Sequence, residues 1–170
     1  MDKRIGSGAG ERVNYGCESE RGQALLEFAF LLPVLMLVLL GMIVFGIAMN
    51  NYLELSNGAA AGAQAISISR GQSTDPCGTA APPFHGAAPT LTTANLSFTF
   101  TITPPVGSTA TAFGPATMGY PPTCTGAAAS MVQGATAQVS VTYPCNLKVF
   151  GINYAPGGCT MTAQTAEAIQ

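Results

Sequence analysis

The chain has 170 residues, of which 48% are hydrophobic and only 8% are charged, and its net charge is −2. An average soluble protein carries roughly 25% charged residues, so the composition departs clearly from that class. A slightly acidic chain gives no electrostatic reason to expect nucleic acid as a partner. The length leaves room for one small domain beside a long helix.

Residues 1–22 form a leader in which charges of both signs alternate with glycines. No apolar periodicity runs through this stretch, so we interpret it as disordered. Its basic residues, which set the orientation predicted below, are Lys3, Arg4, Arg12 and Arg21.

A membrane-spanning helix is predicted over residues 23–50. The 22 residues from Phe28 to Met49 carry no charge, and at about 1.5 Å per residue they cover the roughly 30 Å hydrocarbon core of a bilayer. Basic residues gather on the N-terminal side, whereas Arg70 alone lies near the other end. The positive-inside rule therefore predicts a single-pass protein with a cytoplasmic N-terminus and an exported C-terminal part. An ordinary signal peptide is disfavoured, because its apolar region is only about 7–15 residues long.

Glu27 stands at the entrance of the apolar run, where a carboxylate is costly unless it reaches water or a partner. Either it lies at the interface and needs no role, or it belongs to a motif. It follows Gly22 after four residues and precedes an apolar residue, as in the class III signal of type IV pilins, which this stretch resembles. A wider combination includes Gly22, Glu27-Phe28, Leu32-Pro33, Gly41 and Gly46. Through it, the segment resembles the TadE-like family of pilin-like proteins in the Tad (Flp) pilus system.

The resemblance implies a function and its residues. A prepilin peptidase would cut between Gly22 and Gln23, so the leader would be removed. Glu27, followed by Phe28, would then meet the new amino terminus of a neighbouring subunit in the membrane. The implied partners are other pilin-like subunits, the Tad/Flp machinery, the peptidase and the membrane. The implied function is that of a minor pilin or pseudopilin, a structural component of a Tad-type pilus or secretion apparatus.

The helix is predicted to continue beyond the membrane over residues 51–70. An apolar stripe at helical spacing comprises Leu55, Ala59, Ala63 and Ile66, and a more polar one comprises Glu54, Asn57, Ala61 and Gln64. Arg70 and Gly71 predict the stop, as a cation in the last turn and a left-handed glycine. Gly58 and Gly62 allow a close helix contact, although in an alanine-rich helix their spacing is more often chance.

Residues 71–170 are predicted to form a small, β-rich exported domain. Two strands show clear alternation, with Leu96, Phe98, Phe100 and Ile102 in the first and Ala137, Val139, Val141 and Tyr143 in the second. A third is predicted over 160–166, with Met161 and Ala163 inward. One apolar face suits a sheet packed on one side against the helix, whereas 71–94 and 104–134 resemble loops. The fold class is therefore α+β: one long N-terminal transmembrane helix continuing into a small exported domain with a short antiparallel β-sheet.

Four of the five cysteines follow the apolar run, which fits two disulfides in an oxidising compartment. Of the three possible pairings we favour Cys145 with Cys159, which closes a short hairpin loop, and Cys77 with Cys124, which ties the two long loops. A zinc site is the competing hypothesis, but the chain has no Cys-x2-Cys spacing and one histidine, His85.

No arrangement for catalysis stands out in the exported part. Its charged residues are few and scattered, whereas acid–base and nucleophilic catalysis need positioned groups. We expect His85 to be an exposed loop residue, and we expect no cofactor and no enzymatic activity. The alternative to the pilin-like function is a membrane-anchored surface binding or adhesion domain with an uncleaved signal anchor, in which Glu27 would have no role.

Overall fold

The structure is a computed structural model that describes residues 18–145, 147–155 and 157–170. Its helices are α1 (Glu18–Ile68) and α2 (Pro76–Ala87), with the short 3-10 helices η1 (Thr93–Asn95) and η2 (Ala127–Ser130). Its strands are β1 (Ser97–Thr103), β2 (Phe113–Met118), β3 (Thr136–Pro144), β4 (Lys148–Val149), β5 (Ile152–Asn153) and β6 (Thr160–Ala168). The chain divides into two units, and the second begins at Ile43. The α+β class predicted from the sequence is confirmed.

The first unit contains the N-terminal part of α1. The predicted leader lies mostly in residues 1–17, outside the described residues, but Glu18 to Gly22 are helical, so the prediction of a disordered leader is wrong for these residues. Once a helix is nucleated, each added residue gains a backbone hydrogen bond at little cost, which extends the helix by a turn. The most apolar part of α1 is not buried by any other part of the chain that the structure describes. Among the described residues α1 is the one helix long and apolar enough to cross a membrane.

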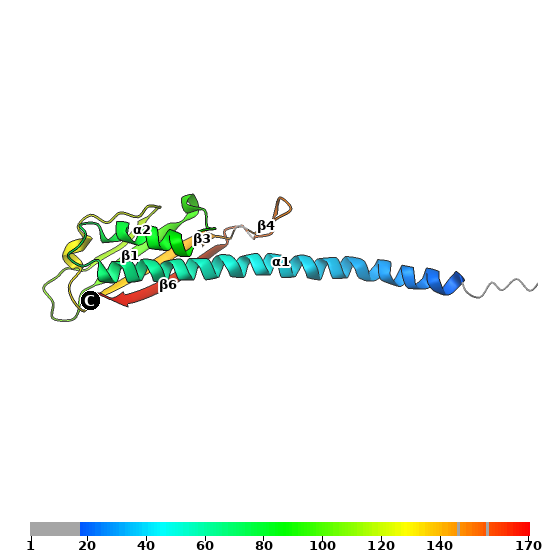
Figure 1. Cartoon of the computed structure of the whole chain (residues 1–170), viewed down its shortest axis with the longest axis horizontal. Helices are drawn as coiled ribbons and strands as arrows, with labels where there is room; N and C mark the ends of the chain where they lie inside the picture. The colour runs from blue at the N-terminus through cyan, green and yellow to red at the C-terminus, as the bar shows by residue number, and fades with distance from the viewer. Residues whose placement is uncertain (1–17, 146, 156) are drawn as a thin grey trace, which may run out of the picture. The chain divides into compact units, whose positions relative to one another are not determined.

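The second unit is a sheet with two helices on its apolar face (Figure 1). The sheet order is β2-β1-β3-β6, and each neighbouring pair is antiparallel. The two predicted strands with clear alternation are confirmed as β1 and β3, and the third as β6, in which Ala163 is buried and Met161 packs against the core.

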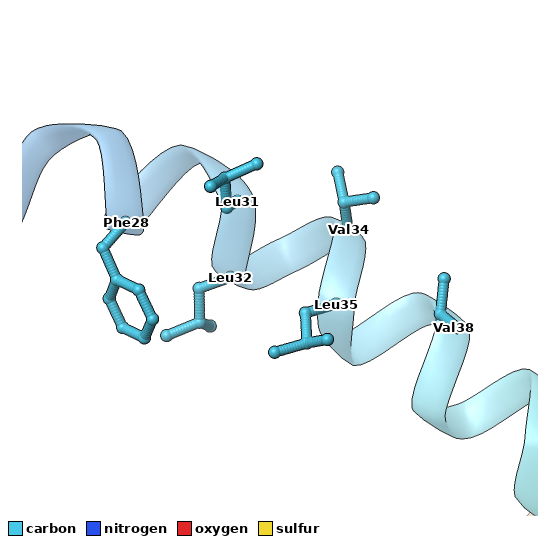
Figure 2. Close-up of a pocket in the computed structure, with 6 residues that line it drawn as sticks. All are labelled: Phe28, Leu31, Leu32, Val34, Leu35 and Val38. Carbon is cyan, nitrogen blue, oxygen red and sulfur yellow. The ribbon is translucent and has the colours of Figure 1, made fainter.

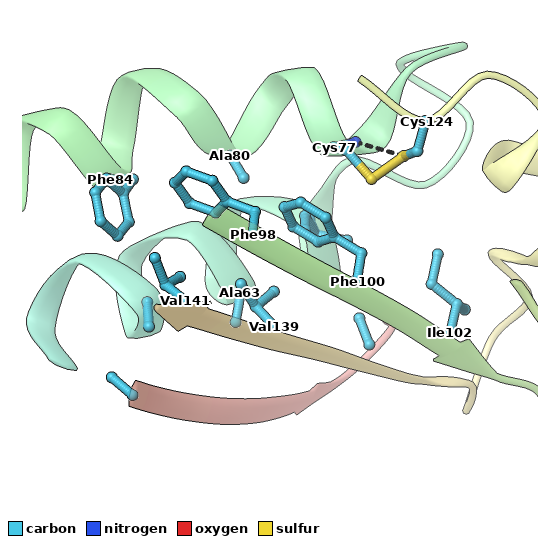
Figure 3. Packing of buried hydrophobic residues seen from close by; sticks show 14 of the residues in the cluster. Ala63, Cys77, Ala80, Phe84, Phe98, Phe100, Ile102, Cys124, Val139 and Val141 are labelled. Atoms are coloured by element: carbon cyan, nitrogen blue, oxygen red, sulfur yellow. Dashed lines mark hydrogen bonds between the residues drawn. A yellow bond between two sulfur atoms is a disulfide. The ribbon is translucent and has the colours of Figure 1, made fainter. Parts of the chain in front are cut away.

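The apolar stripe of α1 forms one layer of the core. Its four members, Leu55, Ala59, Ala63 and Ile66, are no more than 2% exposed, as predicted. They join the buried side chains of β1 and β3 in one cluster (Figure 3). The helix ends at Ile68, before Arg70, so the predicted cation in the last turn is absent. Gly71 does take the predicted left-handed conformation, with φ +71°.

Helix α2 corrects the prediction of a loop over 71–94. Asp75 caps its N-terminus by accepting a hydrogen bond from the Gly78 N–H at 3.1 Å, and Pro76 occupies the first turn, where a missing N–H costs nothing. The ring of Phe84 is buried and makes a T-shaped contact with the ring of Phe98 in β1, with centroids 4.9 Å apart (Figure 3). This burial holds the helix in place although Pro82 and Pro83 each remove a backbone donor.

Strand β2 corrects the prediction of a loop over 104–134. It contains Gly114 and Pro115, which argue against a strand, but it lies at the edge of the sheet, where proline is tolerated. A bulge interrupts its pairing with β1 between Phe100 and Ile102. Gly114 has φ +96°, and a side chain there would collide with the Phe100 carbonyl, so glycine is needed at the bulge.

Both disulfides lie in the second unit and join the pairs favoured above, Cys77–Cys124 and Cys145–Cys159. The first is buried at the start of α2, where the Cys77 N–H also lies 3.1 Å from the Cys124 sulfur (Figure 3). The second joins the end of β3 to the start of β6 and closes the segment that contains β4 and β5.

Gly58 and Gly62 both lie where α1 meets α2. A Cβ atom on Gly58 would lie 2.7 Å from a ring carbon of Phe84, whereas one on Gly62 would lie 3.5 Å from the Ala80 Cβ. The first distance requires a shift of the ring, and the second is an ordinary van der Waals contact.

Alanine substitutions at these two glycines should therefore have opposite effects. Alanine favours a helix over glycine by about 1 kcal/mol, so Gly62→Ala should be neutral or stabilising. Gly58→Ala should lower the free energy of unfolding by about 1–2 kcal/mol, because overpacking costs roughly 1–3 kcal/mol. Denaturant unfolding of the full chain in detergent, followed by tyrosine fluorescence, measures both. Equal effects would show that the Phe84 ring moves aside freely.

Candidate functional site

The residues of the predicted motif lie on consecutive turns of α1. The bond between Gly22 and Gln23 follows the first turn of this helix, and nothing lies within 4 Å of a Cβ atom built on Gly22. The Gln23 side-chain amide donates a hydrogen bond to Glu27 Oε1 at 3.4 Å. The helix thus brings the predicted cleavage position and the glutamate to one face, four residues apart.

Glu27 marks a boundary in the polarity of the first unit. Its side chain and that of Phe28 are both exposed. Its hydrogen bond to Gln23 is long, and a neutral amide is a weak partner for a carboxylate compared with a cation. From Phe28 onward the helix surface carries no charge until after Met49. The carboxylate is therefore the last charged group before the segment that can cross a membrane, and it can accept a stronger donor from outside the chain.

An apolar hollow follows Glu27 along the helix (Figure 2). Its lining residues are Phe28, Leu31, Leu32, Val34, Leu35 and Val38. Phe28, Leu32 and Leu35 project to one side, and Leu31, Val34 and Val38 project to the other. Pro33 lies between them and lacks an N–H, so the Ala29 carbonyl loses its usual helical donor. The surface beside Glu27 therefore offers large apolar side chains to lipid or to another helix.

Two charged groups of the second unit, Glu54 and Asp75, take structural roles. Glu54 Oε2 accepts hydrogen bonds from the Thr90 N–H at 3.1 Å and the Thr90 hydroxyl at 2.6 Å, which ties the segment after α2 to α1. Asp75 Oδ1 accepts from the Cys124 N–H at 2.8 Å besides capping α2. Lys148 and Glu167 are exposed.

Asp75, Cys77 and Cys124 lie close enough together to bind a metal ion, but their sulfur atoms are in the wrong oxidation state for it. Their potential ligand atoms lie within 4.8 Å of one another. The two sulfurs are joined in a disulfide, however, and thiolates are what bind metals. His85 is exposed as expected, but it belongs to α2 and not to a loop. Its ring lies 6.4 Å from that of Tyr120, in a tilted arrangement.

Sequence reasoning missed a hairpin formed by β4 and β5, which lies within the loop closed by Cys145 and Cys159. Its signal was a pair of apolar residues, Val149 and Ile152, on either side of a Phe-Gly pair. This spacing suits a two-residue turn, but aromatic residues are uncommon at such a turn.

The comparisons with known proteins bear on the N-terminal segment. Residues 22–64 match the family model described as TadE-like protein, which confirms the resemblance inferred from the motif. The match covers the predicted cleavage position, Glu27, the apolar run and most of the apolar stripe that packs against the sheet. The chain matches no curated protein and no solved structure.

Proposed function

From the TadE-like character of residues 22–64, we propose that this protein is a pilin-like structural component, a minor pilin or pseudopilin, of a Tad-type pilus or secretion apparatus. The observation that carries the proposal is the register of three features on one helix. Gly22, Glu27 and the uncharged run from Phe28 lie in the order and spacing of a class III signal, within the segment that the family model matches.

Cleavage after Gly22 would give Gln23 a free ammonium group at the start of the mature helix. Four residues of helix span about 6 Å along the axis, so a neighbouring subunit displaced by one turn would bring its ammonium group to Glu27. In surroundings of low dielectric constant such a pair is strongly attractive, and an unpaired carboxylate is costly. The pair would therefore fix the axial register between subunits, while the apolar residues after Phe28 supply the contact area.

The proposed topology places the leader in the cytoplasm and the second unit outside the inner membrane. The basic residues of the leader support this orientation. The two disulfides also support it, because they persist in oxidising compartments. We propose no enzymatic activity, since the charged groups of the second unit cap helices, tie segments together or face solvent.

A prepilin peptidase should cut this chain between Gly22 and Gln23. Co-expression of the full chain with such a peptidase, followed by N-terminal sequencing, should yield a mature protein that starts at Gln23. Gly22→Val should stay uncut, because the class III signal that this stretch resembles has glycine before the cut.

The alternative function, a membrane-anchored binding domain, predicts a different result. Its chain would keep Met1, and a signal-peptidase cut near the alanines that follow Gly58 would give a chain that starts at Gln64. Either terminus would contradict the pilin-like proposal.

A further inference from the structure

The β4–β5 hairpin presents an unusual apolar tip. Lys148 pairs with Asn153, and Val149 pairs with Ile152. The two residues of the turn, Phe150 and Gly151, have φ +50° and +81°. Positive φ at both central residues is the mark of a type I′ turn, where asparagine, aspartate and glycine are the favoured residues. Phenylalanine is strained in this conformation, so local folding does not explain its presence.

Three apolar or aromatic side chains in or next to the hairpin face solvent. Phe150 is 86% exposed, Ile152 60% and Tyr154 44%. Lys148 is exposed beside them. A phenol, a phenyl ring and an aliphatic chain beside a cation are the groups that enter the boundary between lipid headgroups and acyl chains.

The position of the hairpin along α1 can be derived from β6. This strand runs in the same direction as α1 (Figure 1), and the Gln170 N–H donates to the Ser67 carbonyl at 3.3 Å. Thr160 lies ten residues earlier, which is about 30 Å at roughly 3.3 Å per strand residue. Thirty ångströms of helix is about 20 residues, so the start of β6 lies level with the part of α1 near Ile47. Figure 1 shows β4 beyond this end of the sheet.

Ile47 lies two residues before the end of the uncharged run, at Met49. Ile43 to Met49 belong to the same unit as the hairpin. The second unit therefore contains both the last turns of the predicted membrane span and an exposed apolar tip at their level.

From this coincidence we infer that the β4–β5 hairpin inserts its tip into the outer surface of the lipid bilayer while α1 spans it. Phe150 and Ile152 enter the boundary region, Tyr154 lies at headgroup level, and the Lys148 ammonium group pairs with lipid phosphates. The hairpin does not need to bind lipid unaided. Because α1 holds the domain at the membrane, the contact is intramolecular and a few side chains suffice. The inference rests on the membrane anchoring that belongs to the proposed function.

Tryptophan substitution tests this contact directly, because the chain contains no tryptophan. Phe150→Trp in the full chain, reconstituted into phosphatidylcholine–phosphatidylglycerol vesicles, should show blue-shifted emission and strong quenching by brominated lipids. Val106→Trp is the matched control. Val106 is fully exposed, and it follows β1 at the end where Thr103 pairs with Thr136, opposite to the hairpin. Quenching at position 150 should be several-fold greater than at position 106.

A second pair of variants separates lipid contact from folding of the hairpin. Tyr154→Trp reports on the same hairpin, and Phe150→Asn places a favoured residue in the turn. Adding Phe150→Asn to Tyr154→Trp should reduce quenching several-fold while the Cys145–Cys159 disulfide still forms. Unchanged quenching would overturn the role of Phe150.

The remaining outcomes distinguish this inference from the proposed function. If the protein floats with the vesicles but positions 150 and 106 are quenched equally, the lipid contact is wrong and the anchor stands. Blue-shifted emission that is not quenched, and that fades as protein is diluted in lipid, would show that a second copy covers the tip. Failure to float with the vesicles would overturn the anchor together with the hairpin contact.

Discussion

Replacing Glu27 with alanine should abolish assembly into the pilus or secretion apparatus without preventing membrane insertion. Removal of one partner from a desolvated ion pair costs about 3–5 kcal/mol, which lowers a subunit-binding constant by more than about a hundredfold. Insertion should persist, because the uncharged run from Phe28 to Met49 is intact and a charge has been removed from its edge. Piliation counted by electron microscopy and the amount of protein in the membrane fraction measure the two effects.

Two controls sharpen this experiment. Glu27→Gln keeps the size of the side chain but removes its charge, so it should fail as alanine does if ion pairing is the cause. Glu167→Ala removes an equal charge from an exposed position in β6 and should assemble normally. Normal piliation of Glu27→Ala would leave the glutamate as an interfacial residue without a role in assembly.

Loss of the Cys77–Cys124 disulfide should destabilise the second unit more than loss of Cys145–Cys159. The two bonds close loops of 47 and 14 residues. The chain-entropy relation then gives losses of about 4 and about 3 kcal/mol in the free energy of unfolding. Replacing both cysteines of a pair with alanine avoids a free thiol. Cys77 and Cys124 also lie in the core, so their replacement leaves a cavity that adds to the loss.

Denaturant midpoints of the two double variants, compared with the native chain in the same detergent, give this order directly. The variant without Cys145–Cys159 serves as the control for the variant without Cys77–Cys124, since each of them lacks one disulfide. The reverse order would mean that the second unit depends more on the β3–β6 connection than on the attachment of α2.

Periodicity predicted the elements whose patterns are set by burial on one face. In β1, Phe98 and Phe100 are buried while their neighbours are more exposed. The matching alternation of apolar and polar residues can be recognised in the sequence alone. The stripe from Leu55 to Ile66 was predictable for the same reason, because its members recur at helical spacing.

Helix α2 and strand β2 escaped prediction because tertiary contacts override local preference in both. Pro82 and Pro83 indicate a loop, yet burial of Phe84 and the disulfide at Cys77 hold the helix. Asp75 followed by Pro76 is a typical start of a helix. Pro82 and Pro83, however, argued against a helix in this segment. In β2, Gly114 and Pro115 break the pattern of a strand, and only its place at the sheet edge makes them acceptable.

The arrangement of the candidate site residues was predictable because it is local, whereas their role stays a prediction. Gly22, Gln23 and Glu27 lie within two turns of one helix, so their spacing in the sequence is their spacing in space. The hairpin tip at Phe150 depends instead on where β6 places it relative to α1, which involves residues more than 100 positions apart and leaves no local pattern.

The arrangement of α1 over the sheet has a mechanical consequence. The helix that can anchor the chain also supplies Leu55, Ala59, Ala63 and Ile66 to the core, and it lies along the strands (Figure 1). A pulling force transmitted through Ile43 would therefore load these four side chains together, in shear, instead of peeling them away one after another. Resistance to forced unfolding depends on the unfolding rate, and a shear geometry keeps that rate low under tension. We therefore expect the second unit to resist a force applied along the axis of α1.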